Sequence, residues 1–292
     1  MYMKFYDRAG TERRFQLILD SSEGAVVDRA IARCFERGEW YEPDGAALVR
    51  RVVSPGDVFI DVGANVGYYT VLSSVMMSGV GVVISCEPDS ENLIRLRKNI
   101  AVNKLSNCVV VDKVVCNHTG TSDFYINSGS NGSHSIWDPW LLPLLTGSHS
   151  PGRKLTVPSI TLDDIASQFL QSRSGGGKTI IKIDTDGAEQ MVLEGGVSFL
   201  SPEKVPFIIC ELYPPGLERC GYSQSSLRNF MKSIGYDTFL LDGLDNGRNA
   251  DRIPKFIPER TQIKGNFFPN ILFSTVEHIQ LFWPEEEFLN YS

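Results

Sequence analysis

Apolar residues recur along the chain in two different patterns, and their alternation predicts the fold class. Continuous apolar runs are typical of strands buried on both faces, and they occur at residues 58–63, 80–87, 108–115, 180–184, 207–212, 237–241 and 270–274. Helical spacing of apolar residues lies between many of these runs, at 65–78, 90–104, 188–200 and 224–234. Buried strands that alternate with helices predict an α/β fold with a doubly wound, mainly parallel sheet.

Residues 1–56 have a different pattern and are predicted to form an N-terminal extension. Residues 15–20 alternate like a strand, whereas 23–37 and 44–52 have helical spacing. We expect the extension to pack on a core domain formed by residues 57–292.

Residues 127–153 interrupt the alternation of strands and helices. They are rich in Ser, Gly and Pro, yet they include Trp137 and Trp140. Such a segment forms either a variable surface loop or a lid over the carboxyl edge of the sheet, where ligands bind in these folds. The two tryptophans favour the lid. The polar segment 242–269 carries no functional prediction.

Composition and charge narrow the function classes. The 292 residues include 28 Lys and Arg against 35 Asp and Glu, a net charge of −7, which argues against a protein whose main task is to bind nucleic acid. No apolar run approaches the roughly 18 residues of a membrane helix, and the first residues lack the apolar core of a secretory signal. We therefore expect a cytosolic chain that does not bind membranes. The six cysteines form no CxxC pair, which favours reduced thiols over a zinc site.

The segment 61–70, DVGANVGYYT, joins a predicted strand to a predicted helix. Gly63 and Gly67 permit a tight turn, but the third glycine of a dinucleotide fingerprint is missing. Asp61 would repel a pyrophosphate and would suit a positively charged group such as an ammonium. Glu87 ends the next strand, where an acid accepts hydrogen bonds from ribose hydroxyls. The pattern indicates a cationic nucleoside, and S-adenosylmethionine (SAM) fits; the alternative is a tight turn with two surface acids.

Several motifs, in their order and spacing, resemble the FkbM family of SAM-dependent methyltransferases. They are YEP at 41–43, PGDVFIDVGANVGYYT, CEPDSENLIRLRKNI, ITLDDI, IIKIDTDGAEQMVLEGG and IICELYP. The resemblance implies a seven-stranded, Rossmann-like methyltransferase sheet whose last strand, at 270–274, is antiparallel. The cofactor-binding residues predicted from the turn and from the resemblance are Asp61, Gly63, Asn65, Gly67, Glu87, Asp89 and Asp112. Asp112 stands one or two positions before the acid that many such enzymes carry after the third strand.

Acidic residues crowd the ends of two predicted strands that the fold makes neighbours. Asp184 ends the fourth strand, Asp186 and Glu189 begin the following helix, and Glu211 ends the fifth strand. Three interpretations stay open: a general base, an oxygen-ligand site for Mg²⁺ or Ca²⁺, and helix capping with structural pairing. His134 is a further candidate for proton transfer, although a lone histidine in a loop is usually inert.

Together these observations predict a SAM-dependent methyltransferase that O-methylates a hydroxyl on a small metabolite or glycan, with no metal cofactor. A non-catalytic SAM-fold binding module is the alternative. An NAD-dependent oxidoreductase is the third candidate, and the missing glycine and the charge of Asp61 speak against it.

Overall fold

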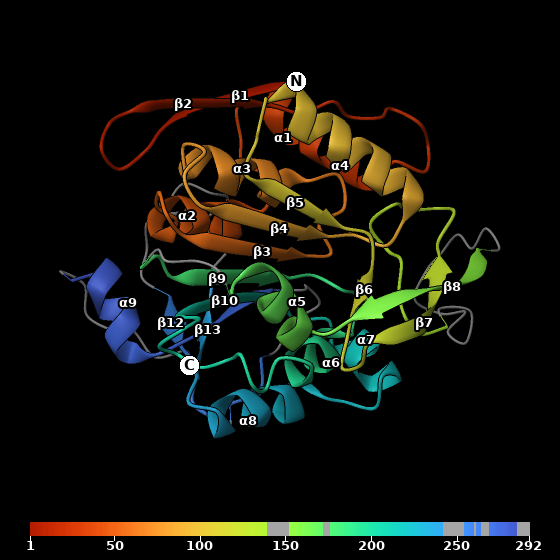
Figure 1. Cartoon of the computed structure of the whole chain (residues 1–292), viewed down its shortest axis with the longest axis vertical. Coiled ribbons are helices and arrows are strands. Elements are labelled where there is room, and N and C mark those ends of the chain that lie inside the picture. The colour runs from red at the N-terminus through yellow and green to blue at the C-terminus, as the bar shows by residue number, and fades with distance from the viewer. Residues whose placement is uncertain (139–151, 172–175, 242–253, 260, 264–268, 285–292) are drawn as a thin grey trace.

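A large mixed sheet forms the centre of the computed structural model (Figure 1). The structure describes residues 1–138, 152–171, 176–241, 254–259, 261–263 and 269–284. Within these residues the sheet has eight strands in the order β12-β11-β13-β10-β9-β3-β4-β5. Their bounds are β3 (Val58–Val62), β4 (Val82–Cys86), β5 (Cys108–Val111), β9 (Thr179–Ile183), β10 (Phe207–Glu211), β11 (Asp237–Leu240), β12 (Lys255–Phe256) and β13 (Asn270–Ser274).

The pairing of these strands confirms the predicted doubly wound sheet. Strands β5, β4, β3, β9 and β10 pair in parallel, and β13 lies antiparallel between β10 and β11. All seven predicted strands are therefore present, with the last one antiparallel. The additional edge strand, β12, is only two residues long. It is too short for a recognisable pattern of apolar and polar residues.

Helices cover both faces of the sheet, and each face has its own apolar cluster. One cluster includes residues of α1 (Val26–Glu36), α2 (Pro43–Val52), α3 (Tyr68–Met76) and α9 (Val276–Phe282). The other includes residues of α5 (Leu162–Phe169), α6 (Glu189–Glu194), α7 (Pro214–Arg219) and α8 (Gln224–Ser233). The first cluster joins the N-terminal extension to the sheet; the predicted division of the chain at residue 56 stays a prediction.

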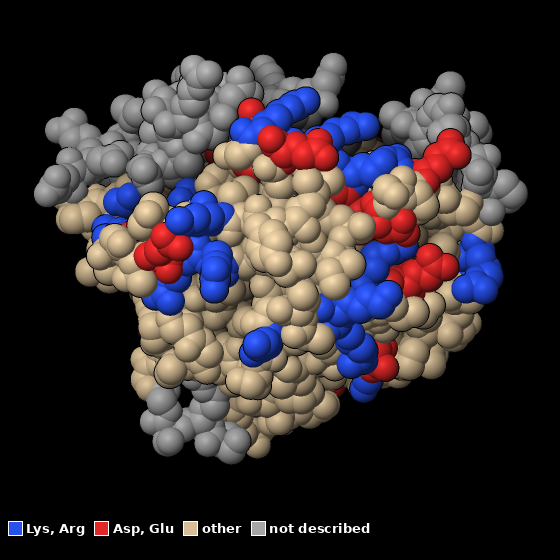
Figure 2. All heavy atoms as spheres, turned by 90° about the horizontal axis from the view of Figure 1, so that it is seen from above, with Lys and Arg blue, Asp and Glu red and all other residues tan. Residues whose placement is uncertain are grey.

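The N-terminal extension begins with a hairpin that the sequence pattern only partly predicts. Strands β1 (Tyr2–Tyr6) and β2 (Glu12–Gln16) pair antiparallel at the top of Figure 1, so the strand predicted at 15–20 overlaps β2 by its first two residues. Figure 2 shows this face, on which Lys and Arg side chains lie among Asp and Glu. Some of these side chains form ion pairs between the two strands of the hairpin, such as Lys4 with Glu12 at 2.8 Å.

A second, smaller sheet was not predicted. The predicted strand at 108–115 is divided, because β6 (Val114–Val115) leaves the main sheet and joins β8 (Arg153–Ile160) and β7 (Gly120–Ile126) in the order β6-β8-β7. In β7 only Phe124 is buried, so this strand lacks the continuous apolar run that identifies the others. Strand β8 begins at Arg153, the last residue of the predicted lid segment.

Two glycines bring the elements of the site close together. Gly63 has a φ of +79°, and a Cβ there would lie 1.9 Å from the carbonyl oxygen of Asp184, so only glycine lets the turns after β3 and β9 approach each other. Gly67 precedes α3 with a φ of +89°, and its Cβ would lie 2.6 Å from Leu96 Cδ1 on α4 (Ser90–Val102). Among the described helices, none is both long and apolar enough to cross a membrane.

Candidate functional site

A cavity of about 340 Å³ lies at the carboxyl ends of β3, β4, β9 and β10. This is the edge at which ligands bind in open α/β sheets. The predicted site residues that line it are Asp61, Gly63, Asn65, Glu87, His134, Asp184, Asp186 and Glu211. The same cavity is lined by Tyr41 and Glu42 of the YEP motif and by residues 131–137, so distant motifs of the sequence meet at one place.

Glu87 is fixed at one end of the cavity by main-chain hydrogen bonds. Its Oε2 accepts from the amide N of Asn65 and its Oε1 from the amide N of Asp89, both at 2.8 Å. The side chain is almost completely buried, and burial raises its pKa to about 7. Each carboxyl oxygen retains acceptor capacity for a ligand.

Asp61 lies beside this turn, at the end of β3. Its Oδ2 accepts a hydrogen bond of 2.6 Å from the Thr70 hydroxyl, whose oxygen is 2.8 Å from that of Ser85. Burial raises the pKa of Asp61 to about 6. A buried carboxyl with one such partner favours a positively charged ligand group, because that charge would offset the cost of ionisation.

The opposite end of the cavity is charged, and a buried lysine lies at its centre. Lys182 Nζ is 3.1 Å from Asp184 Oδ2 and 3.9 Å from Glu42 Oε2, and the side chain is 1% exposed. Although burial opposes ionisation of Asp184, the Lys182 ammonium holds its pKa below the ordinary value. Burial and the neighbouring Asp184 charge raise the pKa of Glu211 well above its ordinary value.

Lys182 was missing from the residues predicted for the site. The sequence contained a usable indication, because the run TIIKI of β9 is buried throughout, and a lysine within a buried strand needs a counter-charge. Glu42 supplies part of it from the loop before α2. The Glu42 Oε2 also accepts a hydrogen bond of 2.9 Å from the Tyr69 hydroxyl.

The two acids after β9 have different places. Asp186 lines the cavity, and burial raises its pKa well above the ordinary value. Glu189 is completely buried and is not among the lining residues; its Oε1 accepts from the amide N of Gly187 at 2.9 Å and from that of Thr185 at 3.3 Å. Glu189 therefore stabilises the turn rather than facing the cavity.

Three predicted cofactor-binding residues do not line the cavity. Asp89 caps α4, where its side chain accepts from the amide N atoms of Glu91 and Asn92. Gly67 packs against α4, and Asp112 is exposed. For Asp112 the reason is the early end of β5, which brings Lys113 and Val114 to the cavity instead.

His134 lines the cavity, but one of its ring nitrogens is occupied. Its Nδ1 accepts a hydrogen bond of 3.0 Å from the amide N of Asn127, so the neutral ring carries its proton on Nε2. Burial lowers the pKa of His134. The Nδ1 lone pair is therefore engaged, and a role of His134 in proton transfer stays a prediction.

The described part of the predicted lid closes one side of the cavity. Trp137 lines it, and its Nε1 donates a hydrogen bond of 2.6 Å to the carbonyl oxygen of Asp186. Residues 139–151, with Trp140, lie outside the described residues, and the closing movement stays a prediction. In the part of the chain that the structure describes, no group of three or more His, Cys, Asp or Glu is arranged to hold a metal ion.

A family model described as the methyltransferase FkbM domain matches residues 61–238. The chain belongs to the FkbM methyltransferase family. The matched residues include both ends of the cavity, from Asp61 to Glu211. A search for similar curated proteins found no match.

The solved structures that resemble this FkbM family member do so distantly. A methyltransferase FkbM from Methylobacillus flagellatus is 17% identical over 87% of this chain, with a TM-score of 0.44, and the chain spans only 56% of that protein. A protein from Streptococcus mutans in complex with SAH is 10% identical over 81% of this chain and 99% of its own, with a TM-score of 0.43. A SAM-dependent methyltransferase from Aquifex aeolicus is 12% identical over 80% of this chain and 88% of its own, with a TM-score of 0.39.

Proposed function

We propose that this methyltransferase uses SAM and O-methylates a hydroxyl on a small metabolite or glycan. One observation carries the proposal: a single cavity joins the Glu87 turn, which suits a nucleoside, to the carboxyl cluster around Lys182, which suits proton transfer. Its volume of about 340 Å³ is within the range of small-molecule sites.

The residues at the turn fit the chemical groups of SAM. Glu87 offers two anchored carboxyl oxygens to the ribose hydroxyls, and Asp61 offers a buried carboxylate to the ammonium. The Oδ1 of Asn65 is buried and has no hydrogen-bond partner among the described residues, so it is a ready acceptor for a ligand donor. Two acids in this wall would oppose a pyrophosphate, which speaks against NAD.

When bound, SAM supplies a methyl group that its sulfonium charge already activates. The chain holds the acceptor in line and receives its proton. Asp184 is suited to accept the hydrogen bond of an acceptor hydroxyl, because the Lys182 ammonium keeps it ionised. Once Asp184 has taken this proton it is neutral, and Glu42, whose Oε2 lies 3.9 Å from Lys182 Nζ, remains as a counter-charge to the ammonium. Positioning supplies much of the remaining acceleration.

Calorimetry with SAM, followed by mass spectrometry of a panel of hydroxyl acceptors, tests the proposal. The wild type should bind SAM, and Glu87→Ala should fold normally yet bind it about 10- to 150-fold more weakly, because roughly 1.5–3 kcal/mol of charge-assisted hydrogen bonding is lost. Unchanged affinity in Glu87→Ala would contradict the assignment. SAM binding without turnover on any acceptor would favour the non-catalytic module.

A further inference from the structure

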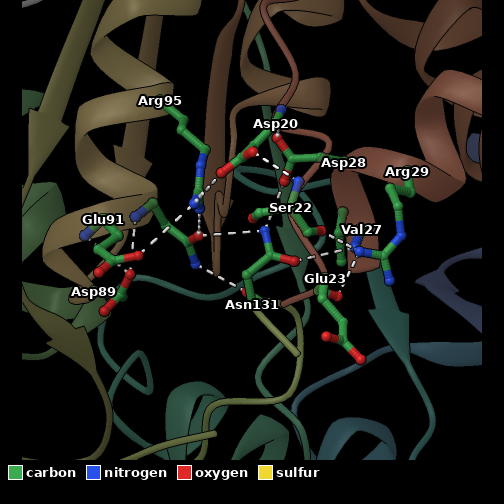
Figure 3. A network of polar contacts seen from close by, with 11 residues as sticks. Asp20, Ser22, Glu23, Val27, Asp28, Arg29, Asp89, Glu91, Arg95 and Asn131 are labelled. Atoms are coloured by element: carbon green, nitrogen blue, oxygen red, sulfur yellow. Dashed lines mark hydrogen bonds and ion pairs between the residues drawn. The ribbon is translucent and has the colours of Figure 1, made fainter. Parts of the chain in front are cut away.

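Asn131 lies between the start of α1 and the start of α4 (Figure 3), and it lines the cavity. It belongs to the described part of the predicted lid, and only 8% of its surface is exposed. Its side chain and its main chain make hydrogen bonds in different directions. The side chain binds the start of α1, and the main-chain carbonyl binds two asparagines that line the cavity.

The two shorter hydrogen bonds of the Asn131 side chain go to the N-terminal extension, and a longer one of 3.5 Å runs from its Nδ2 to Asn92 Oδ1. Its Nδ2 donates to Asp28 Oδ2 at 2.7 Å, and its Oδ1 accepts from the amide N of Val27 at 3.1 Å. Asp28 is fully buried, and its other oxygen accepts from the amide N of Asp20 at 2.8 Å. Because these donors and acceptors are complementary, the position of the Asn131 backbone is well determined.

The main-chain carbonyl of Asn131 accepts two hydrogen bonds from the wall of the cavity. Asn65 Nδ2 donates to it at 2.8 Å and Asn92 Nδ2 at 3.0 Å. Asn65 is also the residue whose amide N donates to the Glu87 carboxylate. Asn131 therefore contacts Asn65, and Asn65 in turn contacts Glu87 at the proposed ribose site.

These contacts decide which way the Asn65 amide points. A main-chain carbonyl only accepts hydrogen bonds, so Asn65 must turn its NH₂ group to Asn131 and its Oδ1 away. That Oδ1 is the buried acceptor with no partner among the described residues. The equivalent oxygen of Asn92 differs, because it accepts from Arg95 Nη1 at 3.1 Å.

Close packing supports the same placement. The amide N of Asn131 donates to the carbonyl oxygen of Gly24 at 3.0 Å. At Gly132 a Cβ would lie 2.2 Å from Val27 Cγ2. The segment therefore lies directly on the start of α1.

We propose that Asn131 is a positioning residue for the cofactor, acting through Asn65. The pair of Asn131 with Asp28 holds the carbonyl that orients the Asn65 amide, so that Asn65 Oδ1 accepts a hydrogen bond from a ribose hydroxyl beside Glu87. This inference rests on the proposed use of SAM.

The test measures SAM affinity by calorimetry in a matched set of variants. Asn131→Asp keeps the shape but replaces the donor with a carboxylate facing that of Asp28, and SAM affinity should fall about tenfold or more. The exchange Asp28→Asn with Asn131→Asp restores one donor and one acceptor and should recover most of the affinity. Asn131→Ala removes the pair without adding charge and serves if the single Asp variant does not fold.

Asn103→Ala is the control. Asn103 also joins the N-terminal extension to α4, through its Nδ2 and the carbonyl oxygen of Gln16 at 2.6 Å, but it does not line the cavity. Its loss should lower stability and leave SAM affinity unchanged. A second measurement uses SAH and its 2′- and 3′-deoxy analogues: the Asn131 variants should lose affinity for SAH and lose much less for the analogue that lacks the contacted hydroxyl.

Folded Asn131 variants that bind SAM as the wild type does would overturn the inference and leave the proposed function intact. Equal losses in Asn103→Ala, equal losses for SAH and both deoxy analogues, or no recovery in the exchanged pair would also overturn it, since each indicates a general structural effect. A wild type that does not bind SAM would refute the proposed function, and this inference with it.

Discussion

The two ends of the cavity are both polar, but one is formed mainly by charged side chains and the other mainly by neutral amides. Around Lys182 the groups are ions, and an ammonium lies 3.1 Å from one carboxylate and 3.9 Å from another. Around Asn131 most of the polar contacts are neutral amides, which Asp28 anchors to the N-terminal extension. Buried ions interact strongly and respond to pH, whereas amides have a fixed direction and no titration.

This difference suggests a division of tasks. The charged end is suited to accept a proton, since the Lys182 ammonium lowers the pKa of Asp184 whereas burial and the Asp184 charge raise that of Glu211. The amide end is suited to hold a ligand in one orientation. Substitutions at the first should therefore change turnover or stability, and substitutions at the second should change affinity.

The largest effect is expected from Asp184→Asn, which keeps the shape of the side chain and removes its charge. With SAM affinity nearly intact, kcat should fall by roughly 10²- to 10⁴-fold, the usual contribution of a general base. Formation of SAH with a hydroxyl acceptor measures it, and EDTA should leave the wild-type rate unchanged. A near-normal kcat would show that positioning alone accelerates the reaction.

Lys182→Met should act on the fold. The substitution leaves Asp184 and Glu42 without the ammonium between them. Breaking a fully buried ion pair from one side costs about 3–5 kcal/mol, and the cost is smaller here because the side chains of Asp184 and Glu42 are 33% and 22% exposed. Urea unfolding at pH 7.5 measures the loss. Adding Asp184→Asn should recover part of it, because fewer charges remain uncompensated. A single variant as stable as the wild type would show that water screens the cluster.

A smaller effect of opposite sign is expected from Glu189→Gln. Burial raises the pKa of Glu189 to about 7 from an ordinary 4.5, so the folded state binds this proton more tightly than the unfolded state. Its contribution to stability is present below about pH 4.5 and is lost as the pH rises through about 7. The neutral glutamine should make the protein about 1–3 kcal/mol more stable at pH 8 than the wild type.

Urea unfolding at pH 5 and pH 8 separates this effect from others. The two proteins should differ little at pH 5, and SAM affinity should be equal in both because Glu189 does not line the cavity. A decrease in stability at pH 8, or a clear loss of SAM affinity, would contradict the structural role assigned to this residue.

The same contrast explains what the sequence could predict. Strands with continuous apolar runs were identified, whereas the half-exposed β7 and the short β12 were not. Helix α6 ends at Glu194, before Gly195 and Gly196, and is shorter than the predicted 188–200. Local patterns therefore predicted the parallel core and missed the parts whose pairing partners determine their structure.

The candidate site shows the same difference between residues placed by local patterns and residues placed by distant partners. Asp61, Glu87, Asp184 and Glu211 were predictable because each stands at or next to the end of a readable strand, and such ends share one edge of the sheet. Asn131 was not, because nothing in the sequence NGSHS indicates that its partners are Asp28 and two asparagines on separate elements.

The hydrogen bond between Asp28 and Asn131 also has a consequence for folding. The two residues are 103 positions apart, and contacts of such separation form slowly because a long stretch of chain must first be ordered. On the ribosome, α1 is synthesised well before Asn131. The contact that joins the N-terminal extension to this wall of the cavity can therefore form only after Asn131 has been synthesised. We therefore expect the ability to bind a ligand to be acquired late, after the helices and central strands have formed.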